Sequence, residues 1–378
     1  MVMKKSIRFL HLILGLTAGI IVFIVAITGC LYAFQEEILD LTETYKFVEH
    51  EDKPVVPPSQ LQDIAHAAFP AKSLHALKYY GNNRAAEAIY YNYEPNYYYI
   101  AYINPYSGKI IKTVDENSGF FRWVLDGHFY LWLPHELGQI VIASATIIFT
   151  VLIVTGIILW WPKTWRTSKQ RFRFMWKKTT QWRRKNYDLH TVTGFYIFPI
   201  ALVFSFTGLV WGFPWFAYGY YTLWGGEKSL IYEDPKVPTF EFQTVKTGMD
   251  IALKNLQQLY PDAYYYEVHP PENNNKAIAA NANLKEGTYW KTNYHYYDPS
   301  TGKEKKVSHI YSTLDKASTA DYVMRMNYDL HTGAILGLPG KITAFAFSLC
   351  IAALPVTGFI MYWGRKNKPT KNKTKPAH

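Results

Sequence analysis

Four long apolar segments divide the sequence, and two stretches of mixed polar and apolar residues lie between them. Each apolar segment is long enough to cross about 30 Å of hydrocarbon, which takes roughly 20 helical residues at about 1.5 Å rise each. The pattern therefore predicts four membrane-spanning helices, Leu10 to Phe34, Leu137 to Trp161, Val192 to Trp215 and Ile342 to Trp363.

The two stretches between paired spans share one pattern. A predicted helix, Gln60 to Phe69 in the first and Val245 to Leu259 in the second, precedes alternating strand-like segments. The turn sequence "INPYSGK" in the first stretch corresponds to "YDPSTGK" in the second. We therefore expect a membrane α-helical protein with α+β extramembrane domains, built as two repeated halves of span, small domain and span.

The placement of charge predicts the orientation of the spans. The net charge is +11, and ten Lys and Arg with no Asp or Glu lie between Trp161 and Lys185. Six more follow from Arg365 to Lys375, directly after the fourth apolar segment. Basic residues beside spans mark the cytoplasmic side, so we expect both termini in the cytoplasm and both large loops in the periplasm of a bacterial inner membrane. Membrane lipid is thus the expected partner of these basic runs, and nucleic acid is not expected.

A Thr-Gly pair occurs in each span. The first, followed by Cys30, resembles a lipoprotein cleavage site, but a signal peptide has an apolar core of about 7 to 15 residues and this one is about 25. Small residues let helices approach closely, so the pairs predict helix packing. The second cysteine, Cys350, lies inside the fourth span, so no disulfide framework is expected. The four pairs are Thr28-Gly29, Thr155-Gly156, Thr207-Gly208 and Thr357-Gly358.

Histidines occupy related positions in the two halves. The sequence Asn-Tyr-Asp-Leu-His-Thr occurs twice and ends near His190 and His331. His11 precedes Thr28 by 17 residues, as His190 precedes Thr207.

The returning spans show the same relationship with one insertion. His331 precedes Thr357 by 26 residues and His128 precedes Thr155 by 27. His135 is an alternative to His128, because it lies next to Pro134 at the start of the second span, although the second half contains no counterpart.

These positions suit haem ligation. An ionisable residue in a span is a functional candidate, and neutral imidazole is a common axial ligand of haem iron. Because about 1.5 Å of rise per residue separates His11 from Thr28 by about 25 Å, the histidines form two layers. We expect His11 with His190 to bind one b-type haem near the cytoplasm, and His128 with His331 to bind a second near the periplasm.

The sequence lacks other redox machinery. It contains no Gly-x-Gly-x-x-Gly after a strand, no P-loop and no cysteine cluster for iron and sulfur. The cytoplasmic loop is too short for a nucleotide domain. Electrons must then come from an unidentified donor, either a soluble protein that docks on the basic loop or quinol from the bilayer.

The chain resembles the PepSY-associated transmembrane proteins. The resemblance rests on Leu-His at the start of spans, Thr-Gly within them, "WWPK" after the second span and an Asp-Pro-x-Thr-Gly turn, which reads "DPSTG" in the second loop and "NPYSG" in the first. It is most similar to the branch of ferric-siderophore reductases, which implies haem between the spans and a ferric-siderophore substrate in the periplasm. The eight tyrosines between Tyr90 and Tyr106 fit strand patterning, and an aromatic shelf for an iron chelate is the alternative.

We therefore expect a dihaem inner-membrane reductase that releases Fe(II) for uptake. The alternatives are a non-redox protein that binds peptides or regulates a protease, and a haem protein with a non-iron acceptor. The expected organisation is span 1–35, PepSY-like domain 36–133, span 134–162, basic loop 163–189, span 190–216, PepSY-like domain 217–338, span 339–364 and basic tail 365–378.

Reporter fusions test the predicted topology. Fusions at Lys109 and Lys303 should register as periplasmic and one at Gln170 as cytoplasmic, because the basic runs stay inside. A cytoplasmic signal from either large loop would overturn the assignment of the two histidine layers to the two leaflets.

Overall fold

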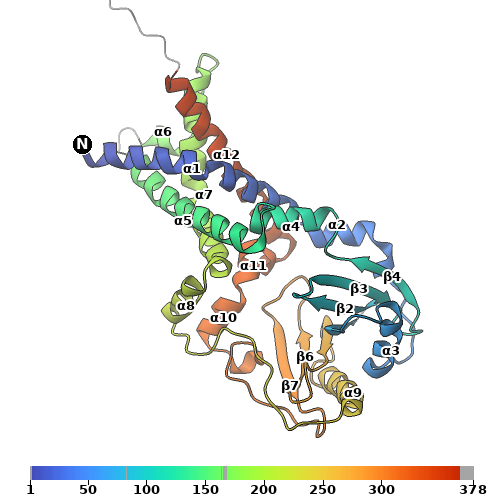
Figure 1. The fold of residues 1–378 in the computed structure, drawn as a ribbon. Helices are drawn as coiled ribbons and strands as arrows, with labels where there is room; N and C mark the ends of the chain where they lie inside the picture. The colour runs from blue at the N-terminus through green and yellow to red at the C-terminus, as the bar shows by residue number, and fades with distance from the viewer. Residues whose placement is uncertain (1, 82, 163, 165–167, 367–378) are drawn as a thin grey trace, which may run out of the picture. The chain divides into compact units, whose positions relative to one another are not determined.

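The computed structural model describes residues 2–81, 83–162, 164 and 168–366. The chain divides into two compact units. The helical unit comprises residues 1–33, 124–214 and 339–378, and the sheet unit comprises residues 34–123 and 215–338. Figure 1 shows the elements of both units.

Four long helices build the helical unit. All four are long and apolar enough to cross a membrane, which confirms the four predicted spans. Small side chains, among them Ala18, Ala26 and Ala201, are buried where the helices meet. Small residues allow close helix packing in a membrane, where apolar burial alone gives little drive for association. The helices are α1 (Val2–Tyr32), α5 (His135–Trp160), α7 (Trp182–Gly212) and α12 (Leu338–Lys366).

Helix α7 begins ten residues before the predicted span. The segment from Trp182 to Thr191 contains neither Pro nor Gly, so nothing interrupts helical hydrogen bonding. The first copy of the repeated motif therefore lies inside α7, with Asn186 about one turn and His190 about two turns from its start. The connection that precedes α7 contains the short helix α6 (Lys169–Phe172). Parts of the predicted basic loop and tail lie outside the described residues, namely 163, 165–167 and 367–378.

A short helix, α4 (Phe120–Tyr130), folds back on α5 through a tight turn. Leu131 and Trp132 adopt positive φ angles of 53° and 56°, which L-residues rarely do. Gly127 makes the turn possible, since a Cβ there would lie 2.4 Å from the Trp132 ring. A Cβ on Gly138 would likewise lie 2.3 Å from the Tyr130 carbonyl oxygen. This turn fixes where α4 presents His128.

The sheet unit contains one antiparallel sheet of seven strands, in the order β4-β3-β2-β1-β5-β6-β7. The first stretch of the chain contributes four strands and the second contributes three. The strands are β1 (Ala76–Tyr80), β2 (Ala86–Asn92), β3 (Tyr97–Ile103), β4 (Ile110–Asp115), β5 (Tyr265–His269), β6 (Ile278–Asn283) and β7 (Thr292–Tyr297).

Pairing of β1 with β5, from Leu77 opposite Val268 to Tyr80 opposite Tyr265, joins the two stretches. The sequence pattern predicts one small domain in each stretch, whereas the structure has one continuous sheet made from both. A pairing between residues almost 190 positions apart leaves no local signal in the sequence.

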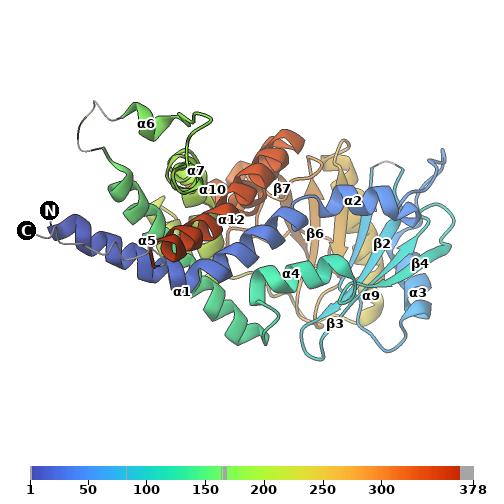
Figure 2. The ribbon, with the colours of Figure 1, turned by 90° about the horizontal axis from the view of Figure 1, so that it is seen from above.

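Helices α3 (Pro58–Ala68) and α9 (Phe242–Leu259) lie side by side against one face of the sheet, as Figures 1 and 2 show. They bury Leu61, Met249 and Leu256 against strand residues such as Leu77 and Val268. The two helices are also joined directly. The Ser59 hydroxyl donates to the Asp250 carboxylate at 2.7 Å.

The two predicted turns have the same construction. Asn104 accepts from the backbone N–H of Tyr106 at 2.9 Å, and Asp298 accepts from that of Ser300 at 2.9 Å. Such Asx turns end here in a glycine of positive φ, Gly108 at 72° and Gly302 at 65°. The related turn sequences therefore fold alike.

The remaining helices connect these parts. One of them, α11, lies in the sheet unit and carries the second copy of the repeated motif. They are α2 (Gln35–Thr42), α8 (Pro214–Leu223), α10 (Thr319–Arg325) and α11 (Asn327–Thr332).

Candidate functional site

His11 of α1 and His190 of α7 meet inside the helical unit. Their ring centroids are 6.4 Å apart and the ring planes are nearly perpendicular, at 87°. The sequence predicts this pair as one layer, and the structure brings the two side chains together. The next question is what holds each ring in place.

His11 is held by the threonine of the Thr-Gly pair on α5. Its Nδ1 lies 2.8 Å from Thr155 Oγ1. The Thr155 hydroxyl donates its proton to the Val151 carbonyl, 2.8 Å away in its own helix. Because that proton is already used, Oγ1 accepts from Nδ1–H of His11. The neutral ring then carries its lone pair on Nε2.

His190 is held in the same way by α12. Its Nδ1 lies 3.1 Å from the Leu354 carbonyl oxygen and 3.0 Å from Thr357 Oγ1. A carbonyl oxygen can only accept, so Nδ1 carries the proton and Nε2 the lone pair.

His128 repeats this arrangement against α1. Its Nδ1 donates to the Val25 carbonyl at 2.9 Å and lies 3.2 Å from Thr28 Oγ1. His135 is exposed at the start of α5, with its ring 4.6 Å from that of Tyr130. The shared geometry favours His128 over His135 as the functional residue.

The glycine of each pair lets the imidazole lie against the helix. A Cβ on Gly29 would be 3.1 Å from Cε1 of His128, and one on Gly358 would be 3.3 Å from Cε1 of His190. For Gly156 and His11 the distance is 3.5 Å. From the sequence, these Thr-Gly pairs are predicted only to let helices pack closely. In the structure they also provide the surface on which the histidine rings lie. The constant spacing between His and Thr indicates that the two residues are related, but it does not indicate which helix each threonine faces.

The two predicted histidine layers are separate along α1. His11 lies near its start, whereas His128 contacts α1 at Thr28, 17 residues further on. At about 1.5 Å per residue this is about 25 Å along the helix.

The repeated motif gives its residues distinct roles. In α7 the Asn186 amide donates to the Thr357 carbonyl at 2.9 Å, so Asn186 and His190, one turn apart, engage the same threonine. Asp188 accepts from the Trp176 indole at 3.1 Å and from Arg184 at 2.9 Å. The aspartate thus fastens the preceding basic loop to the helix that carries His190.

In the second copy, on α11, the aspartate fastens a different loop. Asp329 accepts from the backbone N–H groups of Tyr289 and Trp290, at 3.1 and 2.9 Å. Burial raises the pKa of Asp329, although these N–H groups oppose the rise. His331 lies on the same helix, half-buried, in the sheet unit. Because His128 belongs to the helical unit, their pairing stays a prediction.

The face of the sheet opposite α3 and α9 carries a charged row that the sequence analysis did not single out. Lys78 lies between Glu87 and Glu267 on neighbouring strands. Its ammonium lies 4.3 Å from the Tyr265 ring centre and 5.1 Å from that of Tyr80. Burial alone would lower the pKa of Lys78, but these carboxylates and phenols raise it well above its ordinary value.

The tyrosines of β2 and β3 alternate between the two faces. Tyr90 and Tyr99 both contact Phe69 on the covered face. Tyr91 and Tyr98 contact each other on the opposite face, where Tyr91 also meets His75. This is the strand patterning predicted from the sequence.

The other histidines make ordinary contacts. His295 Nδ1 lies 3.0 Å from Glu304, and His309 Nε2 lies 3.1 Å from the Glu233 carbonyl. Among the described residues, no group of three or more His, Cys, Asp or Glu side chains could hold a metal ion. The imidazoles of His11 and His190 form the candidate site.

Comparison with known families adds a finding that covers almost the whole chain. A family model described as the PepSY-associated TM region matches residues 8–365. The match includes all four spans and both polar stretches between them. No curated protein matches the chain.

Proposed function

This chain belongs to the family of the PepSY-associated TM region, and we propose that it is a haem-dependent reductase of the bacterial inner membrane. It would pass electrons across the bilayer to a ferric siderophore in the periplasm. The observation that carries the proposal is the pair His11 and His190, each with Nδ1 bonded to a neighbouring helix and Nε2 left as the basic nitrogen.

The geometry of this pair fits a haem iron. The ring centres of His11 and His190 lie 6.4 Å apart, so the two imidazoles could together hold one haem iron. Bound haem would supply one-electron transfer at a potential set by its axial ligands.

The chain's own residues orient these ligands and tune them. An acceptor at Nδ1 fixes the tautomer and the ring direction, and makes Nε2 a stronger donor to iron. Thr155 does this for His11, Thr357 for His190 and Thr28 for His128. We propose His331 as the fourth ligand on the basis of the repeat.

The predicted topology places His11 and His190 near the cytoplasm and the second layer near the periplasm. An electron that enters on the basic side would then leave beside the sheet unit. We assign the ferric chelate to that unit, because Lys78 and its surrounding phenols offer hydrogen-bond donors and aromatic faces to an oxygen-rich ligand. The choice of a siderophore rests on the family resemblance.

Reduction would release the metal. Siderophores bind Fe(III) through hard oxygen atoms, and Fe(II) binds such ligands more weakly. The non-redox alternative, a protein that binds peptides or regulates a protease, requires no haem. A Soret band that shifts on reduction would exclude it, and a folded preparation that cannot take up haem would exclude the reductase.

Removal of single histidines tests the two layers. His11→Ala and His190→Ala should each leave about half of the pigment, because each haem needs both axial ligands. His128→Ala and His331→Ala should remove the other half, and His135→Ala is the matched control that should remove none. Loss of haem in His135→Ala but not in His128→Ala would show that the wrong histidine was chosen.

Replacement of a threonine tests the positioning of the rings. Thr155→Val removes the acceptor of His11 Nδ1–H and should raise the midpoint potential of that haem by tens of millivolts, roughly, since the ligand becomes less basic. Thr155→Ser should restore the wild-type potential. Thr146→Val, which loses only a hydrogen bond to the Ile142 carbonyl, is the control. Equal shifts of the midpoint potential in both valine variants would show that Thr155 does not tune the haem through His11.

The substrate is tested with reduced protein. Protein reduced chemically without oxygen should be reoxidised by a ferric hydroxamate, with about one Fe(II) captured by a ferrous trap for each electron lost. If the haem stays reduced with a panel of ferric chelates but is reoxidised by another periplasmic acceptor, the electron pathway stands and the iron substrate is refuted.

A further inference from the structure

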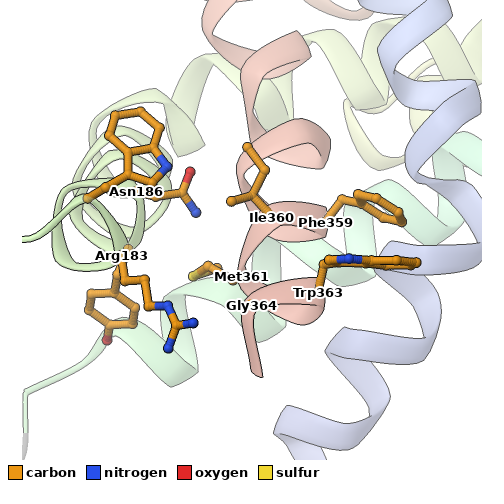
Figure 3. A pocket seen from close by; sticks show the side chains of 9 residues that line it. Arg183, Asn186, Phe359, Ile360, Met361, Trp363 and Gly364 are labelled. Carbon is orange, nitrogen blue, oxygen red and sulfur yellow. The ribbon is translucent and has the colours of Figure 1, made fainter. Parts of the chain in front are cut away.

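A groove of about 540 Å³ lies between α7 and α12 in the helical unit. Its walls are mainly apolar and aromatic, and include Trp182, Phe359, Ile360 and Trp363. Figure 3 shows Arg183 and Asn186 reaching from α7 toward Ile360 and Met361 of α12. The size and the mixture of apolar walls with a few polar groups are typical of a small-molecule site.

Asn186 lines this groove, and its amide has one acceptor without a donor among the described residues. Its Nδ2 donates to the Thr357 carbonyl, which fixes the orientation of the amide because that carbonyl can only accept. Its Oδ1 is buried and accepts no hydrogen bond from the residues that the structure describes. The whole residue is 1% exposed. A buried acceptor without a donor is unfavourable, so a ligand with a hydroxyl group would stabilise it.

The groove is one helical turn from the proposed electron entry site. Asn186 and His190 are four residues apart on α7, and both hydrogen-bond to Thr357. A molecule in the groove therefore lies next to the ring that shares a site with His11.

We propose that this groove binds a lipid-soluble quinol, which serves as the electron donor. This inference rests on the proposed function and names the donor for that same site. Both helices are long and apolar enough to span a membrane, so a ligand with a hydrocarbon tail can enter from lipid. The quinol ring suits the aromatic walls, one hydroxyl donates to Asn186 Oδ1, and the Arg183 guanidinium can bind the second oxygen.

Two other occupants fit less well. The phosphate of a phospholipid would pair with Arg183, but the phosphodiester itself contains only acceptors, so a donor to Asn186 Oδ1 would have to come from the head group. A nicotinamide or flavin nucleotide needs a phosphate-binding loop, and the sequence contains no Gly-x-Gly-x-x-Gly after a strand.

The reaction balances with the proposed acceptor. A quinol that becomes a quinone loses two electrons and two hydroxyl protons. Two ferric ions take one electron each and become ferrous, and the two protons pass to water at the end of α7 that carries the basic loop.

Binding can be measured without any redox activity. Decylubiquinol, the form that carries the hydroxyl donors, should quench the tryptophan fluorescence of the purified full-length protein kept reduced with dithionite, because Trp182 and Trp363 line the groove. Ile360→Phe should weaken this binding by about tenfold by filling the groove. Leu349→Phe, a change of the same size at an exposed position of α12 outside the groove, should leave it unchanged. Equal quenching in both variants would overturn the proposal.

Further outcomes separate this inference from the proposed function. If phosphatidylglycerol at equal concentration abolishes the quenching, the groove binds lipid and the proposal of a quinol site is overturned. Decylubiquinol that neither binds nor reduces a pigment which dithionite reduces would also overturn it, while the reductase stands. If the protein cannot take up haem but still binds the quinol in the groove, the quinol site stands and the proposed reductase function is refuted.

Discussion

A neutral imidazole inside an apolar helix bundle has one N–H that must find an acceptor. In this chain the acceptor comes from the neighbouring helix, as the hydroxyl oxygen of a threonine or a nearby backbone carbonyl. That single bond fixes the tautomer, aims Nε2 and ties two helices together. It also gives a reason for the glycines that follow Thr28 and Thr357, since each ring lies against the helix backbone where a Cβ would crowd Cε1.

The same bond determines what the rest of the repeated motif does. Because His190 and Asn186 lie one turn apart, both reach Thr357, and the helix pair α7 and α12 is held at two points. The aspartate between them faces elsewhere and fastens a loop. In α7 that loop carries Trp176, and in α11 the corresponding Asp329 holds the backbone at Tyr289 and Trp290. The same six-residue sequence therefore makes different contacts in α7 and in α11.

The sequence predicts the parts of this structure that depend on local pattern. The four spans follow from apolar length, and the Asx turns at Asn104 and Asp298 follow from their turn residues. The approach of His11 to His190 follows from the spacing of His and Thr. The pairing of β1 with β5, the row around Lys78 and the groove beside Asn186 depend on residues far apart in the chain, so no local pattern indicates them. The turn at Leu131 and Trp132 is also hidden, because neither residue favours positive φ.

The surroundings of the two motif copies also give the proposed electron path its direction. Two equivalent histidine layers would make a symmetric path, with no preferred end for the donor. The first copy borders a mainly apolar groove and a basic loop, whereas the second copy is joined through Asp329 to a loop of the sheet unit. A hydrophobic two-electron donor suits the first environment, and a water-soluble acceptor suits the second. The asymmetry of the proposed reaction would then arise from the different surroundings of the two motif copies.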